Sequence, residues 1–129
     1  MNQPINILKT LKSFKYAGAG IFSLFRHENN AKVHILAASI ALILGVYFEI
    51  ASYEWISIFI VIGLVCAAEA INTAIEKLAD VVSPTYHEGI KVVKDLAAAA
   101  VLILAITSAI VGGIIFLPKI YTDILGFIL

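Results

Sequence analysis

The sequence lacks most of the features that mark soluble nucleotide-binding proteins and secreted domains. Its 129 residues include a single cysteine, Cys66, so one chain can form neither an internal disulfide nor a cysteine metal cluster. Nine basic and nine acidic side chains cancel, and no basic run is present to follow a phosphate backbone. There is no Walker loop, no nucleophile elbow and no histidine pair at zinc-binding spacing. These absences argue against nucleic-acid binding, P-loop chemistry and a zinc enzyme.

Apolar residues, in contrast, are abundant. They make up 61% of the chain, and the mean hydropathy is +0.99, which is typical of a protein that has a bilayer as its solvent. Three long segments, 33–50, 54–81 and 90–117, are apolar enough to cross a membrane as helices, and Pro118 is expected to end the third. We therefore predict an all-α membrane protein that forms a single domain over residues 1–129.

Residues 5–26 have a different pattern, in which apolar side chains recur every three or four positions. Ile7, Leu11 and Phe14 share one face of this segment, whereas Lys9 and Tyr16 fall on another. This spacing predicts an amphipathic helix on the membrane surface, with its lysines near anionic headgroups. A helix packed on the transmembrane bundle is the alternative, and the two interpretations are compatible.

The distribution of lysine and arginine orients the predicted helices. Basic residues precede the first apolar segment and surround the second link, at Lys77, Lys91 and Lys94, whereas the first link has none. By the positive-inside rule, the N-terminus and the second link are cytoplasmic.

Four polar residues of the second segment share one helical face. Glu69, Asn72, Glu76 and Asp80 are spaced by three, four and four residues, and Glu69 lies about 21 Å along the helix from Trp55. A carboxylate at that depth costs a few kcal/mol unless it is paired, solvated or protonated, and such residues usually serve a function. Asp80 opposes the helix macrodipole, so a cation is expected to face it.

A purely structural interpretation of this stripe is also possible. In that interpretation these are ordinary interfacial charges, Lys77 pairs with Asp80, and Asn72 bonds to a neighbouring helix.

Further charged residues are predicted on the same side of the membrane. Glu28 follows the surface helix, and Lys94 and Asp95 open the third apolar segment. Two carboxylates such as Glu28 and Glu76 suit a Mg²⁺ ion that carries nucleotide phosphates, and Lys94 at a helix N-terminus suits a phosphate. A lysine that snorkels to the interface is an equal alternative for Lys94.

The motifs EAINTAIEKLAD, SPTYHE and KDLAAAAVL together resemble the bacterial diacylglycerol kinase and undecaprenol kinase family, over nearly the whole chain. The resemblance implies an ATP-dependent membrane lipid kinase in the bacterial inner membrane. It also implies a homotrimer with active sites shared between subunits. It implies that Glu69 is the general base, that Glu28 and Glu76 hold Mg²⁺, and that Asn72 and Asp80 form a supporting polar network.

The same resemblance implies further contacts with both substrates. It places ATP against Lys9, Tyr16, Glu28, Glu76, Tyr86, His87, Lys94 and Asp95, and the lipid against Glu69, Ala98 and Trp55. The family often has arginine where this chain has Lys9, and lysine cannot form the bidentate fork that arginine makes with phosphate.

The acceptor stays open at this stage, with diacylglycerol first and a prenol alcohol such as undecaprenol close behind. SPTYHE and RHENNAKVH look closer to the undecaprenol-type members. Two other classes compete with a kinase: a small proton-coupled transporter, which would also use Glu69, and a structural subunit that packs through small residues.

Overall fold

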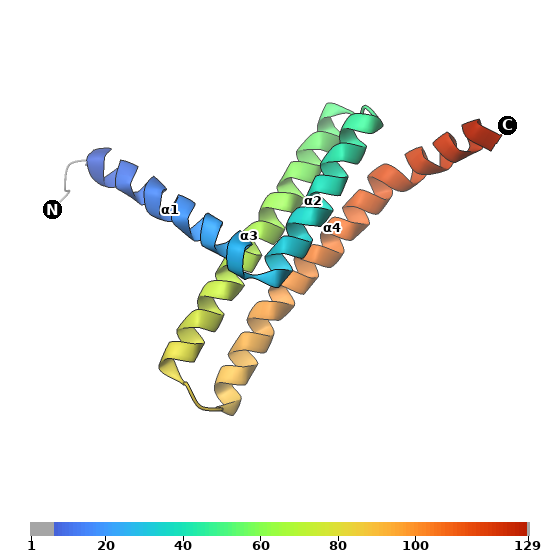
Figure 1. The fold of residues 1–129 in the computed structure, drawn as a ribbon. Helices are drawn as coiled ribbons and strands as arrows, with labels where there is room; N and C mark the ends of the chain where they lie inside the picture. Colours follow the sequence, from blue (N-terminus) through green and yellow to red (C-terminus); the bar gives the residue numbers. More distant parts are fainter. Residues whose placement is uncertain (1–6, 129) are drawn as a thin grey trace.

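The structure is a computed structural model that describes residues 7–128, and all regular structure in this range is helical. The four helices are α1 (Ile7–His27), α2 (Asn29–Tyr47), α3 (Ser52–Val82) and α4 (Glu88–Ile128). α3 and α4 form a long hairpin, α2 packs on α3, and α1 leaves the bundle sideways near the middle of α3 (Figure 1). The arrangement places the α1–α2 junction beside the middle of the hairpin.

Three of these helices are long and apolar enough to cross a membrane. They are the segments Asn29–Tyr47, Ser52–Val82 and Glu88–Gly126. Together with their exposed apolar surfaces, they make the chain an integral membrane protein.

The turn between α2 and α3 ends α2 with a Schellman motif. The amide of Ile50 donates to the carbonyl of Gly45 at 3.1 Å, and the amide of Glu49 donates to that of Val46 at 3.3 Å. Glu49 occupies the left-handed position of this motif with φ 48°, where glycine is the usual residue. At the start of α3, the carboxylate of Glu54 accepts a hydrogen bond from the amide of Ala51 at 2.8 Å.

The tightest packing lies near this turn. Ile50, Ile58, Ile115 and Phe116 form a buried cluster that joins the turn, α3 and α4. Trp55 lies so close to Gly45 that a Cβ atom on this glycine would come within 2.7 Å of the indole ring. The absence of a side chain at Gly45 therefore lets the start of α3 approach α2.

The sequence predicted that α4 ends at Pro118. This prediction is wrong, because the helix continues to Ile128. Pro118 has no amide hydrogen to donate, so it removes one hydrogen bond from the helix interior, and its ring crowds the carbonyl four residues earlier. The buried residues Ile115 and Phe116 hold the helix before the proline, and an ion pair from Lys119 to Glu54 holds it afterwards. These contacts offset the lost bond.

Candidate active site

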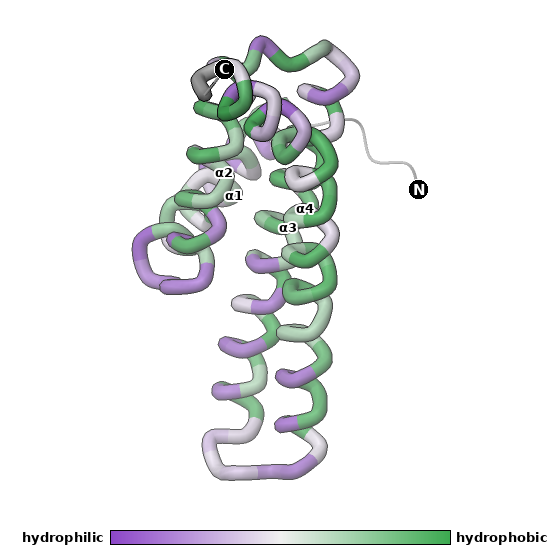
Figure 2. Tube along the Cα trace, turned by 90° about the vertical axis from the view of Figure 1, so that its right-hand side faces the viewer, coloured by the Kyte–Doolittle hydropathy of each residue, from purple (hydrophilic) through white to green (hydrophobic). Residues whose placement is uncertain are grey.

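The polar stripe of α3 passes from buried to exposed along the helix. Glu69, Asn72 and Thr73 are 3%, 5% and 8% exposed, Glu76 is half-buried, and Asp80 is exposed. Figure 2 shows that the hydrophilic residues of α3 and α4 gather in the half of the hairpin nearest to the turn between them. The stripe thus connects the interior of the bundle with its polar end.

Two buried oxygen atoms of the stripe have no hydrogen-bond partner among the described residues. They are Oε2 of Glu69 and Oδ1 of Asn72, whereas Nδ2 of Asn72 donates to Oε1 of Glu76 at 3.1 Å. A buried polar group without a partner costs about 1–3 kcal/mol. The site therefore offers acceptors that a ligand hydroxyl or a second polar group can satisfy.

Ionisable side chains from three parts of the chain lie near Glu69. His34 on α2, Glu76 on α3 and Glu28 at the α1–α2 junction are all close enough to act on it electrostatically. The buried carboxylate is therefore the point at which these elements converge.

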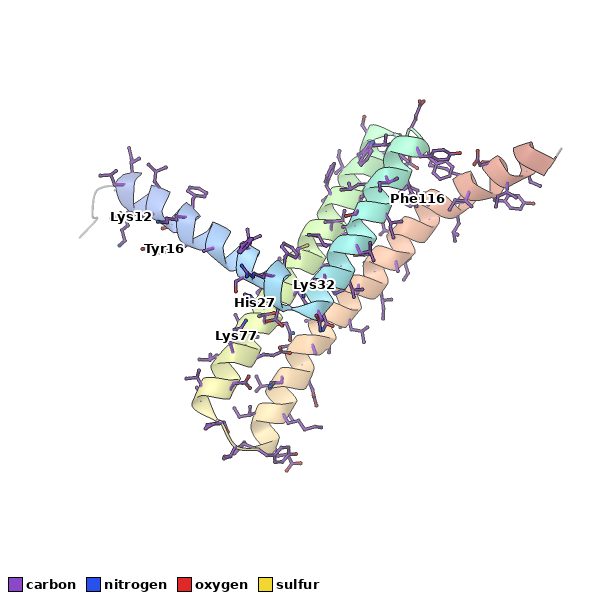
Figure 3. All side chains as sticks on the ribbon, in the orientation of Figure 1. Lys12, Tyr16, His27, Lys32, Lys77 and Phe116 are labelled. Carbon is purple, nitrogen blue, oxygen red and sulfur yellow. The ribbon has the colours of Figure 1, made fainter. Side chains whose placement is uncertain are left out.

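Lys77 connects the α1–α2 junction to the stripe. Its Nζ atom lies 3.0 Å from Oε1 of Glu28, and Figure 3 shows the labelled Lys77 and His27 near the crossing of α1 and α3. The structural alternative that paired Lys77 with Asp80 is wrong, because Lys77 points to the junction instead. Asn72 likewise bonds to Glu76 on its own helix rather than to a neighbouring helix.

The cation expected opposite Asp80 is Lys94. Its Nζ atom lies 3.0 Å from Oδ1 of Asp80, so the pair joins the polar ends of α3 and α4. Asp95, the next residue, accepts from Lys91 one turn earlier at 3.3 Å. Both residues that open the third apolar segment therefore lie among charges at the polar end of the hairpin.

An apolar cavity lies beside the buried end of the stripe. It has a volume of about 330 Å³ and is lined by residues of α2, α3 and α4, including His34, Val65 and Cys66. Several of its wall residues on α2 and α4 are small, among them Ala37, Ala41 and Gly112. A narrow apolar chain fits such a space.

The donor set suits magnesium bound together with a nucleotide. The described residues contain no group of three or more histidine, cysteine, aspartate or glutamate side chains arranged to hold a metal. Mg²⁺ needs no such cage, because it usually takes one or two carboxylates and completes its shell with waters and phosphate oxygens. Glu28 and Glu76, both near Glu69, provide carboxylates of this kind.

The predicted ATP residues outside the stripe lie in two other places. Lys9 and Tyr16 are on α1, which Figure 3 shows pointing away from the hairpin. Tyr86 is exposed in the α3–α4 link, and Nδ1 of His87 accepts a hydrogen bond from the amide of Gly89 at 3.1 Å. His87 therefore caps α4, a structural task that the sequence did not indicate.

The predicted lipid contacts are far apart. Trp55 lies near the opposite end of α3 from the stripe and stacks on Phe59 with ring centroids 5.6 Å apart. Ala98 is exposed on α4, one turn beyond Lys94. Only a long molecule lying along the bundle can reach both Trp55 and Glu69.

Sequence reasoning missed three residues of the site. Lys77 had been given only a local partner, and His34 and Thr73 had no role. The spacing of Thr73, four residues after Glu69, was a signal that it shares the stripe. Lys77 pairs with Glu28 at the α1–α2 junction, and His34 lines the cavity between α2, α3 and α4. Helical periodicity does not reveal such relationships between helices.

Comparison with known proteins shows the family to which this chain belongs. The sequence profile described as prokaryotic diacylglycerol kinase matches residues 15–116, which include every residue of the stripe. The chain belongs to the prokaryotic diacylglycerol kinase family. Family membership makes it a membrane lipid kinase and gives no support to the transporter alternative.

Individual relatives differ in their named substrates. The chain is 44% identical to the undecaprenol kinase of Bacillus subtilis (strain 168) over 108 residues, which is 84% of this chain and 88% of that protein. It is 35% identical to a diacylglycerol kinase of Synechocystis over 109 residues, or 84% of this chain and 62% of that protein. The diacylglycerol kinase of Escherichia coli (strain K12) is 25% identical over 109 residues, covering 84% and 89% of the two chains.

Proposed function

We propose that the protein transfers the γ-phosphoryl group of MgATP to the hydroxyl group of a membrane lipid at the polar stripe of α3. The observation that carries this proposal is the buried Glu69 carboxylate, whose Oε2 atom has no hydrogen-bond partner within residues 7–128, next to an apolar cavity. A lipid substrate needs an apolar space for its chain and a polar group for its hydroxyl. Both are present here, and the stripe then continues toward water, where the nucleotide is dissolved.

In the proposed reaction, Glu69 accepts the proton of the lipid hydroxyl while the oxygen of that hydroxyl attacks the γ-phosphorus of ATP. The bond between the γ-phosphorus and the bridging oxygen breaks, and ADP leaves with the electron pair of that bond. Positioning and charge stabilisation provide most of the rate enhancement in phosphoryl transfer, and a positioned base adds about 10²–10⁴-fold. Asn72 supports this geometry by fixing Glu76 through its hydrogen bond.

Glu28 and Glu76 would hold Mg²⁺, which neutralises negative charge on the phosphates when it is bound. Lys77 lies on Glu28, so its ammonium group is well placed to move onto a phosphate when the carboxylate takes the metal. Lys94, held by Asp80 at the start of α4, provides a second cation for the nucleotide. Lys9, Tyr16, Tyr86, His87 and Asp95 remain proposed ATP contacts.

Undecaprenol is the acceptor that we favour, in place of the diacylglycerol that came first from the sequence. The chain is more similar to a relative named undecaprenol kinase, at 44% identity, than to those named diacylglycerol kinase, at 35% and 25%. Small residues along the cavity also suit a slender prenyl chain, with Trp55 and Ala98 as proposed contacts along its length. Diacylglycerol remains the second candidate because two relatives at 35% identity carry that name.

We also propose a homotrimer in the bacterial cytoplasmic membrane, with the N-terminus in the cytoplasm and α1 lying amphipathically on the membrane surface. The family resemblance supports the trimer, and the basic residues before α2 and around the α3–α4 link support the orientation. Light scattering of the purified protein tests the subunit number, since a monomeric mass would contradict shared active sites.

The acceptor is tested by offering purified protein in mixed micelles undecaprenol and diacylglycerol side by side, with labelled ATP. We expect label in both lipid extracts, with a higher kcat/KM for undecaprenol. Label only in diacylglycerol would reject the favoured acceptor while keeping the kinase, and label in neither lipid would reject the proposed reaction.

A further inference from the structure

The last part of α4 lies outside the family match, which ends at residue 116. After Pro118 the helix continues to Ile128, and Figure 1 shows this end diverging from α2 and α3. We call residues 119–128 the C-terminal segment. The proposed kinase chemistry assigns no task to it.

The C-terminal segment has two distinct faces. Its polar face carries Lys119, Thr122 and Asp123, which lie on one side of the helix. Its apolar face carries Tyr121, Ile124 and Leu125 on the opposite side. Such a division is typical of a helix at an interface between an apolar and a polar phase.

The polar face is the one that contacts the rest of the protein. Lys119 Nζ lies 3.2 Å from Oε1 of Glu54, whose side chain is only 12% exposed. The hydroxyl of Tyr47 donates to Oδ2 of Asp123 at 3.2 Å. These contacts hold the start of the segment against the ends of α2 and α3 next to the turn that joins them.

The apolar face is left uncovered, with Tyr121 65% and Ile124 53% exposed. In a water-soluble protein the apolar face of a helix would pack inward, so this arrangement is reversed. The exposed residues also continue the row that α4 presents along its membrane-spanning part. That row consists of the exposed residues Ile103, Ile106, Ile110, Ile114, Leu117, Tyr121 and Ile124.

The length of α4 exceeds what a bilayer core requires. From Lys94, at the polar end of the hairpin, to Ile124 is about 45 Å along the helix axis, compared with about 30 Å of hydrocarbon. The segment therefore begins near the far edge of the hydrocarbon and extends into the headgroup region, where tyrosine is favoured.

We propose that the C-terminal segment is a lipid-binding anchor in the leaflet on the side of the α2–α3 turn. Its apolar face lies in the acyl boundary of that leaflet, and Glu54 and Tyr47 hold its polar face toward the protein. The occupant follows from continuity: the row of exposed apolar residues along the membrane-spanning part of α4 passes without a break into the segment.

Spin labels on the full-length protein test this placement. In a Cys66→Ala background, Leu125→Cys and Thr122→Cys are each labelled with a nitroxide and reconstituted in phosphatidylglycerol–phosphatidylcholine vesicles. Glu88→Cys provides a reference for water and Ile103→Cys a reference for lipid. We expect the logarithm of the ratio of oxygen to nickel-chelate accessibility to be positive at Leu125 and negative at Thr122.

Two results would overturn the proposal. Equally high nickel-chelate accessibility at both positions would place the segment in water. Low accessibility of Leu125 to both oxygen and the nickel chelate would mean that protein covers it. Lys119→Gln provides an independent check, because it removes the ion pair but leaves the Glu54 bond to Ala51. We expect it to increase nitroxide mobility at Leu125, and unchanged mobility would reject the role of Glu54. Kinase activity enters neither readout, so a failed acceptor assay leaves these results valid.

Discussion

Asn72 donates a hydrogen bond to Oε1 of Glu76 from one turn away, and this bond fixes a carboxylate at the point where α3 leaves the buried part of the bundle. The contact connects a buried amide to a half-buried carboxylate. It also explains why the stripe contains an asparagine between two glutamates, since a third carboxylate there would repel both of them.

Glu76→Gln separates the charge of this carboxylate from its hydrogen bond. The glutamine Oε1 can still accept from Asn72, so the local structure is expected to persist while the negative charge is lost. We expect the Mg²⁺ concentration for half-maximal activity to rise by about tenfold, which corresponds to about 1.4 kcal/mol. An unchanged Mg²⁺ titration would remove Glu76 from the proposed metal site.

The Lys94–Asp80 pair is predicted to affect nucleotide binding more than stability. Lys94 is 37% exposed and Asp80 69% exposed, and exposed pairs are worth about 0.2–1 kcal/mol. We expect Lys94→Met to lower stability by less than about 1 kcal/mol but to raise the KM for ATP severalfold. Asp80→Asn is the matched variant, and a double-mutant cycle in thermal unfolding measures the coupling of the pair. A normal KM in Lys94→Met would show that this lysine has only a structural task.

Because α2 and α3 approach closely at Gly45, we predict that alanine lowers stability at this glycine but not at Gly63. In Gly45→Ala, the new Cβ would meet the Trp55 ring at 2.7 Å and Ile50 at 3.2 Å, so packing must shift at a cost of about 1–3 kcal/mol. Gly63→Ala is the control, because nothing lies within 4 Å of its Cβ position. Thermal unfolding in detergent compares the two, and equal stability would contradict the packing of Trp55 on α2.

The turn after α2 predicts a stabilising substitution. Glu49 has a φ of 48°, a conformation that costs a residue with a Cβ atom about 1 kcal/mol relative to glycine. Glu49→Gly is expected to raise the free energy of unfolding by up to this amount, without changing activity. A loss of stability would mean that the carboxylate of Glu49 contributes more than its backbone conformation costs.

The helical class and the polar stripe of α3 could be predicted from the sequence because both depend on local periodicity. Glu69, Asn72 and Glu76 repeat at helical spacing, and the depth of Glu69 followed from counting residues from Trp55. Contacts between helices depend on how the helices are placed around one another, so the partners of Lys77 and Lys94 came only from the structure.

At Pro118 local sequence reasoning failed, because the proline predicted the wrong end for α4. A proline inside a helix usually kinks or breaks it, but tertiary contacts on both sides of Pro118 keep α4 continuous. The local rule therefore failed where packing near the α2–α3 turn took over.

Glu69→Gln tests the central claim most directly, with Glu49→Gln as a control for loss of a carboxylate elsewhere. Both variants are purified in detergent, checked for unchanged thermal unfolding, and mixed with labelled ATP, Mg²⁺ and undecaprenol in a single-turnover experiment. We predict that phosphorylation by Glu69→Gln is slower by about 10²–10⁴-fold, the usual contribution of a general base, whereas Glu49→Gln matches the unmodified protein. A rate for Glu69→Gln within twofold of the unmodified protein would contradict the assignment of Glu69 as the base.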